Sequence, residues 1–238
     1  MIRQHYFERV SSTMDVIHRL AGEGAEAGTA VIAGEQLEGR GSRGRAWRSP
    51  PGGLWLSVLF RPSTAAGVEV TSLRVGLAVA ESIEAYAGCR IGLKWPNDII
   101  LDGRKLGGVL CEARWQGDTL GWIAVGIGVN VRNRVPTELA GVAVSLAHHR
   151  PDAVADDLAD PVVAALRDLD LGAGQLSAAE MSRFARRDWL RGRRVTEPAV
   201  GTAMGIHADG ALLIRPPQGP DISLRSGPVE LAAVSHSR

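Results

Sequence analysis

The sequence predicts an α/β (α+β) protein in which helices and strands alternate up to about residue 190 and a small β-rich module follows. The chain has 238 residues, enough for one sizeable core plus an appended module. Up to residue 190, segments with apolar residues at helical spacing alternate with short apolar runs bounded by turn residues. From residue 191 only short β-rich runs remain. We therefore predict two domains, 1–190 and 191–238.

The first elements surround a loop rich in glycine and arginine. Residues 13–21 carry apolar side chains at helical spacing, and Ser12 and Thr13 are suitable N-caps, so a short helix is expected. The apolar run 30–36 predicts a strand that ends at the loop. The run 54–60 follows a Pro-Pro-Gly-Gly turn and predicts a second strand.

A long helix and three adjacent strands are expected next. Between residues 68 and 87 an apolar side chain recurs every three or four positions, which is typical of a helix with one buried face. Strands are predicted at 98–101, 105–115 and 119–131. Asp-Gly and Gln-Gly-Asp turns separate them, so adjacent antiparallel pairing is expected.

The last 90 residues predict two helices and then short strands. Residues 152–190 show two helical patterns, and Pro161 is expected to break the first or to lie in its first turn. The β-rich runs that follow are separated by Gly, Pro and Asp-Gly turns, a spacing that indicates a small barrel-like module. They lie at 193–197, 202–207, 211–215 and 221–225.

Composition limits the kinds of partner and compartment. The formal net charge of +1 gives no overall attraction to nucleic acid or a membrane surface. Cys89 and Cys111 have no second cysteine or nearby histidine at metal-ligand spacing, so both are expected to be reduced and structural. With no apolar run of membrane-spanning length and no signal-like start, a cytoplasmic location is expected.

The loop 39–50 is the strongest local feature. Glycines let a backbone approach a ligand closely, and guanidinium groups match phosphate and carboxylate oxygens, so an anion is the expected guest. A solvated basic loop is the alternative for this cluster taken alone. Trp47 suits a flat group such as adenine, although it could equally belong to the core. The four arginines of the loop are Arg40, Arg43, Arg45 and Arg48.

A second group of charged residues occupies 94–112. Lys94 and Asp98 flank a rigid Trp-Pro-Asn turn, and Lys105 follows one hairpin later, beside Gly107 and Gly108. A cation there can neutralise phosphate charge, and a carboxylate can hold Mg²⁺ or orient an amine. A surface salt bridge is the alternative for any single member.

Three polar positions have both a structural and a ligand-binding interpretation. Asn130 ends an apolar strand, where it either caps a turn or bonds a ligand edge. Ser12 and Thr13 act as N-caps or contact a ligand, and Gln36 is a polar contact or a surface residue. Spacing does not decide between these interpretations.

Together these segments resemble the biotin–protein ligase family. SSTMD, GEQLEGRGSRGRAWRSP, KWPNDIILDGRKLGGVLCE and VGIGVNV occur in the family's order and approximate spacing. The resemblance covers residues 11–131 and, more loosely through DGALLIR and ISLRSG, the C-terminal module. It implies a class II synthetase/biotin ligase-like catalytic domain, a mixed sheet flanked by helices, with a small SH3-like C-terminal barrel.

The resemblance also implies roles for individual residues. The biotin-binding residues would be Ser12, Thr13, Met14, Gln36, Arg40, Gly41, Ser42, Lys105, Gly107 and Gly108. Nucleotide binding would fall to Arg43, Trp47, Lys94, Asn130 and Arg225. The catalytic residues would be Arg40, Lys94, Asp98 and Lys105, with Asp98 also the candidate Mg²⁺ ligand.

The implied reaction uses ATP and Mg²⁺ to activate biotin as biotinyl-5'-AMP, then transfers biotin to a lysine of a biotin carboxyl carrier protein domain, such as that of acetyl-CoA carboxylase. A monomer or homodimer is expected. Only 11 residues precede Ser12, too few for a helix-turn-helix, so no DNA binding or repressor activity is expected.

Two positions depart from the family pattern, and two other functions are alternatives to the one that the resemblance implies. Met14 stands where the family often has Asn, so either one hydrogen bond to biotin is lost or Asp15 replaces it. Ser42 stands where many members carry Arg, which removes a cation from the loop, so the intermediate is expected to be held less tightly. A lipoate–protein ligase or octanoyltransferase resembles this fold but lacks the GRGxRGRxW and KWPND pair. An RNA-binding module would use the Arg-rich loop, and the near-zero net charge argues against it.

Overall fold

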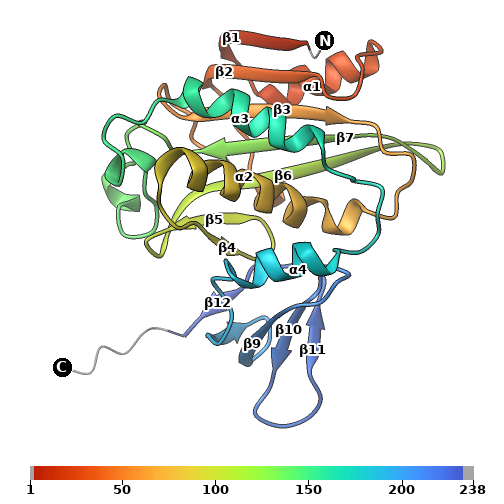
Figure 1. Ribbon diagram of the computed structural model, residues 1–238, viewed down its shortest axis with the longest axis vertical. Coiled ribbons are helices and arrows are strands. Elements are labelled where there is room, and N and C mark those ends of the chain that lie inside the picture. The colour runs from red at the N-terminus through yellow and green to blue at the C-terminus, as the bar shows by residue number, and fades with distance from the viewer. Residues whose placement is uncertain (1–2, 233–238) are drawn as a thin grey trace.

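A seven-stranded mixed sheet forms the larger part of the molecule (Figure 1). The computed structural model describes residues 3–232. Strand β1 pairs with β2 in parallel, and every other neighbouring pair is antiparallel, so the predicted mixed sheet is confirmed. In spatial order the strands are β1 (Gln4–Val10), β2 (Ala30–Gln36), β3 (Leu54–Phe60), β7 (Thr119–Val129), β6 (Arg104–Gln116), β5 (Asp98–Leu101) and β4 (Gly92–Lys94).

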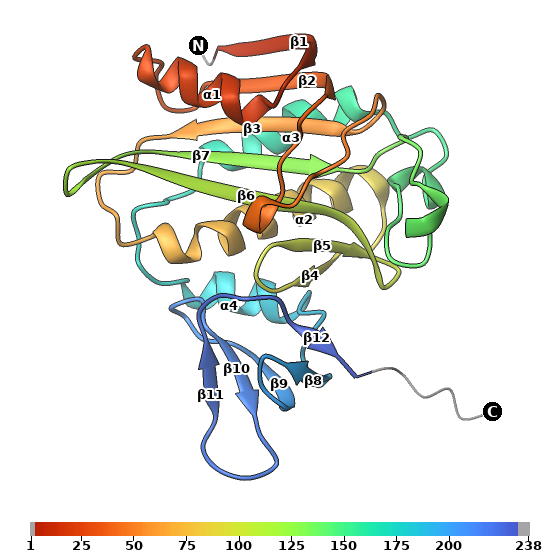
Figure 2. The same ribbon diagram turned by 180° about the vertical axis from the view of Figure 1, so that it is seen from behind.

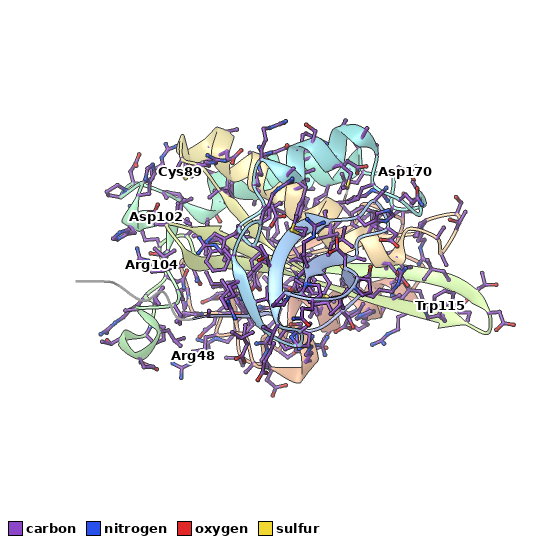
Figure 3. The ribbon with its side chains drawn as sticks, turned by 90° about the horizontal axis from the view of Figure 1, so that it is seen from below. Arg48, Cys89, Asp102, Arg104, Trp115 and Asp170 are labelled. Carbon is purple, nitrogen blue, oxygen red and sulfur yellow. The ribbon has the colours of Figure 1, made fainter. Side chains whose placement is uncertain are left out.

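The antiparallel succession β5–β6–β7 is the predicted meander. Asp102 and Gly103 both have positive φ, 50° and 74°, as a two-residue hairpin turn of the type I′ class requires. The β6–β7 hairpin extends beyond the rest of the sheet, and Figure 3 shows Trp115 near its tip, at the opposite end of the molecule from Asp102. Strands β1 and β4 were not predicted: the first mixes polar and apolar residues at an exposed edge, and the second has three residues.

Helices cover both faces of the sheet. Helix α1 (Thr13–Gly22), capped by the Ser12 side chain, packs on β2, β3 and β7 on the face seen in Figure 2. Helices α2 (Thr71–Ala87) and α3 (Ala155–Arg167) cover the other face. Two hydrophobic cores result, and the one under α1 consists of Met14, Ile17, Ala21, Val31, Leu59 and Ala124.

The expectation that Pro161 breaks its helix or lies in the first turn is wrong. Helix α3 is continuous, and Pro161 is its seventh residue, on the exposed side. A proline inside a helix costs roughly 3 kcal/mol. Burying the apolar face of α3 outweighs this, at roughly 1.5–3 kcal/mol for each fully buried large side chain. These side chains are Leu158, Val162, Val163 and Leu166.

Helix α4 (Ala178–Ala185) leads into a second sheet. A capping box joins Ser177 and Glu180 at its start, and the helix ends before the predicted residue 190. The five-stranded antiparallel sheet includes all four predicted runs, and the two-residue strand β12 was missed. Its order is β11 (Ile222–Leu224), β10 (Leu212–Arg215), β9 (Gly201–Ile206), β8 (Arg194–Glu197) and β12 (Glu230–Leu231).

The second sheet contacts the main one through the turn before β5. The Trp95 indole nitrogen donates over 2.9 Å to the carbonyl of Gly210, in the turn between β9 and β10. The segment between α4 and β8 also joins β4, because the Leu93 amide donates to the Arg187 carbonyl. The division at residue 190 stays a prediction, and residues 233–238 lie outside the described part. Among the described residues, no helix is long and apolar enough to cross a membrane.

Candidate active site

A cavity of about 980 Å³ lies on the α1 face of the sheet, beneath the β2–β3 loop, which crosses that face in Figure 2. It brings together segments that are far apart in the sequence: the start of α1, the β2–β3 loop, and strands β4 to β7. The predicted site residues that line it are Ser12, Thr13, Met14, Gln36, Arg40, Gly41, Ser42, Trp47, Lys94, Asp98, Lys105, Gly108 and Asn130. The two basic stretches therefore face one space.

One end of the cavity is a set of buried, mutually bonded polar groups. The Gln36 side-chain oxygen accepts from the Thr13 amide at 2.8 Å and from the Thr13 hydroxyl at 2.9 Å. The Gln36 amide nitrogen donates to Ser49, and the Ser57 hydroxyl donates to Thr13. Ser12, Thr13 and Gln36 all line the cavity, and their contacts with a ligand stay predictions.

The adjoining wall is apolar and is shaped by glycines of β7. At Gly126 a Cβ would lie 2.9 Å from the Met14 sulfur, so the missing side chain makes room for Met14. Leu110 and Ile127 continue this wall. A ligand with a polar head and an apolar chain fits such a surface.

Trp47 lies flat against the next glycine of the strand. A Cβ on Gly128 would be 2.6 Å from the Trp47 indole nitrogen, and the Lys105 ammonium lies 5.2 Å from the centroid of the indole rings. The indole N–H is buried and has no hydrogen-bond partner. A buried donor without an acceptor is unfavourable, so a ligand acceptor at this point would be stabilising.

The β2–β3 loop folds as an irregular hairpin. Gln36 pairs with Ser49, and Arg40 pairs with Ala46. A Cβ on Gly39 would lie 2.4 Å from the Trp47 carbonyl oxygen, so only glycine allows this close backbone approach. At the tip, Ser42 accepts hydrogen bonds from the Arg45 guanidinium, at 3.0 Å to the hydroxyl.

The opposite end of the cavity is cationic. The Lys105 ammonium donates to Asp98 at 2.5 Å, and Lys94 lies opposite Asp98 in the backbone register of β4 and β5. Burial lowers the pKa of Lys94, and Lys105 adds to this lowering while Asp98 opposes it. The basic lining residues are Arg40, Arg45, Arg48, Lys94, Lys105 and Arg134, against the acidic Glu35, Glu38 and Asp98. An anionic group is favoured at this end.

The shifted pKa of Lys94 leads to a pH prediction. Because burial favours its neutral form, Lys94 should lose its proton below its ordinary value of 10.5. The rate of any catalytic step that needs the Lys94 ammonium should therefore fall as the pH rises through the lowered pKa of Lys94. In Lys94→Arg the fall should move to higher pH, since arginine stays charged. A pH–rate profile of both proteins measures this, and superimposable alkaline limbs would refute it.

Three predicted residues do not line the cavity. Arg43 is at the tip of the loop, exposed, with φ 62° and ψ 37°. Gly107 serves strand packing, because a Cβ there would lie 2.5 Å from the Gly128 carbonyl oxygen. Arg225 forms exposed ion pairs with Glu69 and Asp209, at 3.0 and 2.9 Å. Their predicted ligand contacts stay predictions.

Several residues of the site were not predicted. Ser49 and Ser57 complete the polar end, and Trp189 lines the cavity with Lys94 5.6 Å from its ring centroid. Asn133 donates to the Asn130 side-chain oxygen, and Asn130 donates to Val144, so Asn130 also anchors the loop after β7. Ser57 is the single polar residue in the apolar run of β3, which could have pointed to it, whereas no local signal marks Trp189.

The cysteines do not enter the site, and both are free. Burial raises the pKa of Cys111 to about 12 and raises that of Cys89, so both are poor nucleophiles. This agrees with their predicted structural role.

The described residues do not fit a magnesium ion held by the protein alone. In residues 3–232 no group of three His, Cys, Asp or Glu side chains is placed to hold a metal. Asp98, the predicted ligand, is bonded to Lys105. Magnesium commonly reaches proteins through one or two carboxylates plus substrate phosphates. Asp98 as a magnesium ligand therefore stays a prediction, in which substrate phosphates would supply further oxygen ligands.

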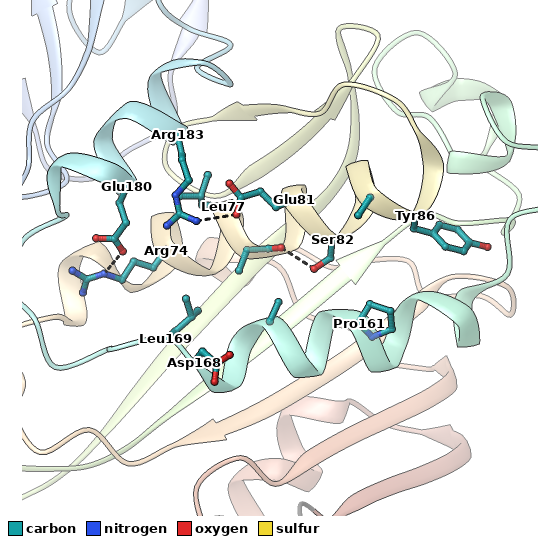
Figure 4. Close-up of a pocket in the computed structure, with 13 residues that line it drawn as sticks. Arg74, Leu77, Glu81, Ser82, Tyr86, Pro161, Asp168, Leu169, Glu180 and Arg183 are labelled. Carbon is teal, nitrogen blue, oxygen red and sulfur yellow. Dashed lines mark hydrogen bonds and ion pairs between the residues drawn. The ribbon is translucent and has the colours of Figure 1, made fainter.

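A second cavity, of about 640 Å³, lies between α2, α3 and α4 on the other face (Figure 4). It contains none of the predicted site residues. Four of its five charged side chains already pair, Arg74 with Glu180 at 2.8 Å and Arg183 with Glu81 at 3.0 Å, and the fifth is Asp168. The cavity beneath the β2–β3 loop is therefore the candidate active site.

Known proteins share this sequence pattern. The bifunctional ligase/repressor BirA of Bacillus spizizenii is 38% identical over 146 residues, which cover 59% of this chain and 45% of that protein. This chain thus spans less than half of that relative. The biotin–[acetyl-CoA-carboxylase] ligase of Paracoccus denitrificans is 32% identical over 203 residues, covering 79% of this chain and 85% of the relative.

The fold and the family model agree with these relatives. A biotin protein ligase from Aquifex aeolicus, solved in complex with biotin and ATP, superposes with a TM-score of 0.80 at 26% identity, covering 98% of this chain and 99% of that one. The model of the biotin/lipoate A/B protein ligase family matches residues 6–130, more than half of the chain. The chain belongs to the biotin/lipoate A/B protein ligase family.

Proposed function

We propose that the protein is a biotin–protein ligase, which activates biotin with ATP and transfers it to a lysine of a biotin carboxyl carrier protein domain. One observation carries the proposal: cations from two separate stretches converge at one end of a cavity whose other end is neutral and polar. The names of the Paracoccus and Aquifex relatives support the choice of biotin and ATP.

The cavity matches the three parts of biotin. A cyclic urea offers two N–H donors and a carbonyl acceptor, which suit the side chains of Thr13 and Gln36. The thioether ring and aliphatic chain would lie along Met14, Leu110 and Ile127. The carboxylate would then reach the ammonium of Lys105.

In the first step a biotin carboxylate oxygen attacks the α-phosphorus of ATP. A new P–O bond forms, the bond to the bridging oxygen breaks, and pyrophosphate leaves. Lys94, Lys105 and Arg45 stabilise the negative charge that spreads over the phosphates. The adenine would lie by Trp47, and Mg²⁺ would enter with the nucleotide.

In the second step a neutral lysine amine attacks the acyl carbonyl, and a C–N bond forms. The C–O bond to AMP breaks, and AMP leaves with the electron pair of that bond. The amine nitrogen gives up one proton to solvent, which leaves the amide. Asp98 would orient the amine through a hydrogen bond. The step needs no serine or cysteine nucleophile, in keeping with the raised pKa values of both cysteines.

A lipoate-specific ligase is the rival within the family. Mass spectrometry of a carrier domain incubated with enzyme, ATP and either biotin or lipoate separates the two. The proposal predicts a mass increase of one biotinyl group with biotin and none with lipoate. A lipoyl adduct alone would refute it.

Three further expectations stay predictions: the cytoplasmic location, the oligomeric state and the lack of operator binding. A gel-shift assay tests the lack of operator binding.

Ser42 leads to a prediction about retention of the intermediate. Ser42 accepts from Arg45, and replacing it by Arg would add a cation to the loop over the cavity. In Ser42→Arg, biotinyl-AMP should dissociate more slowly, by about threefold to tenfold for one added charge contact. A dissociation rate measured by competition with unlabelled biotin tests this, and an unchanged rate would contradict it.

A further inference from the structure

Arg40 is held by two carboxylates that come from different elements. Its guanidinium lies 2.7 Å from Asp15 of α1 and 3.9 Å from Glu112 of β6. Arg40 lines the cavity, whereas Asp15 and Glu112 do not. Asp15 and Glu112 therefore approach Arg40 without lining the cavity themselves.

Glu112 is itself fixed by a histidine with a defined tautomer. The Trp122 indole N–H, which can only donate, lies 3.0 Å from His18 Nδ1, so this nitrogen is the acceptor. The proton is then on Nε2, which donates to Glu112 at 2.8 Å. His18 and Glu112 are both largely shielded from solvent, with side chains 13% and 24% exposed.

The charges around His18 favour its neutral form. Burial lowers the pKa of His18, Arg114 and Arg40 lower it further, and Glu112 opposes them. Arg61 lies 5.6 Å from the ring centroid of Trp122 on the same side of the sheet as α1. A neutral imidazole accepts the bond from Trp122 at Nδ1 and donates its Nε2 proton to Glu112, whose carboxylate faces Arg40.

We propose that Glu112, oriented by His18 and Trp122, acts with Asp15 as a positioning residue that holds Arg40, and with it the β2–β3 loop, at the wall of the cavity. The two ends of the loop have other anchors, since the Glu38 amide donates to the Ser11 carbonyl and Arg48 pairs with Glu138. The tip differs: residues 43–46 are exposed, and Arg45 bonds only to Ser42 within the loop. Fixing Arg40 therefore restricts the tip of the loop. The consequence for biotin rests on the proposed function, whereas the restriction of the loop does not.

The test compares Glu112→Gln and Asp15→Asn with Glu23→Gln. Glu23 forms an exposed pair with Arg19 on the same helix as Asp15 and is distant from the loop, so it controls for loss of a surface carboxylate. Asp15 is exposed, so Asp15→Asn keeps the experiment possible if Glu112→Gln does not fold. The first readout is trypsin cleavage after Arg43, Arg45 and Arg48 in the ligand-free protein.

Both test variants should be cleaved faster in the loop than wild type and than Glu23→Gln. The second readout is biotin-dependent exchange of pyrophosphate into ATP, where KM for biotin should rise about threefold to tenfold, more than kcat falls. If the two carboxylates only stabilised the fold, their replacement would lower the melting temperature without raising KM for biotin more than it lowers kcat. Unchanged cleavage and unchanged KM in both variants would overturn the proposal. If wild type shows no biotin-dependent exchange, the proposed function fails and the cleavage rates alone decide the inference.

Discussion

Replacing Lys105 by Ala should lower kcat/KM for biotin-dependent adenylation by about 100- to 1,000-fold, the range seen when one group that stabilises transition-state charge is removed. Lys105 bonds Asp98 at 2.5 Å and lies over Trp47, so it is central to the cationic end of the cavity. Its removal also leaves Asp98 without its partner, and the unopposed carboxylate would repel the phosphates.

The matched control is Arg104→Ala. Arg104 is the preceding residue of β6, with a side chain on the other face of the strand, and it does not line the cavity. Steady-state pyrophosphate exchange should show Arg104→Ala within about twofold of wild type. Equal losses in the two variants, or a Lys105→Ala enzyme with normal kcat/KM, would contradict the assigned role.

Replacing Gly39 by Ala should lower kcat/KM by about 100-fold while leaving the fold intact. The added Cβ would lie 2.4 Å from the Trp47 carbonyl oxygen and 2.6 Å from the Ser49 hydroxyl, and the first of these is backbone. The loop must therefore shift, which displaces Trp47 and Arg40 from the cavity. Displacements of about 1 Å can reduce rates by this amount.

Gly22→Ala serves as control, because a Cβ at that position meets nothing within 4 Å. Gly39 lies outside both hydrophobic cores, so the melting temperature of Gly39→Ala should stay within a few degrees of wild type. A large fall in melting temperature would show that the loop supports the core, contrary to the structure. Normal activity with normal stability would show that the loop geometry does not matter for catalysis.

The parts of the fold that the sequence predicted well are those with a strong local pattern. Helices α1 and α2 and strands β2, β3 and β5 have clear periodicity and turn residues at their ends. Strand β1 has no such pattern, because an edge strand next to solvent needs no continuous apolar run. The continuity of α3 across Pro161 could not be predicted locally, because it depends on burial of the apolar face of the helix, which outweighs the helix-breaking effect of proline.

In the candidate site, too, local contacts could be predicted from the sequence, whereas contacts between distant segments could not. Lys94, Asp98 and Lys105 lie on three successive strands, β4, β5 and β6, joined by short turns, so their proximity could be predicted from spacing alone. Trp189 reaches Lys94 only because the segment after α4 packs beside β4, where the Leu93 carbonyl accepts from the Trp189 amide. The pairing of Arg40 with Glu112, 72 positions later, likewise depends on the sheet register. Such contacts have no signature in a single sequence.

Exchange of labelled pyrophosphate into ATP tests most directly whether the cations from the two stretches act together on one acyl-phosphate. Wild-type enzyme should catalyse exchange that requires biotin, while lipoate and octanoate should not replace it. Single losses at Arg40 or Lys105 should each reduce the exchange. Exchange supported by lipoate but not by biotin, or exchange that persists without any carboxylic acid, would contradict the account.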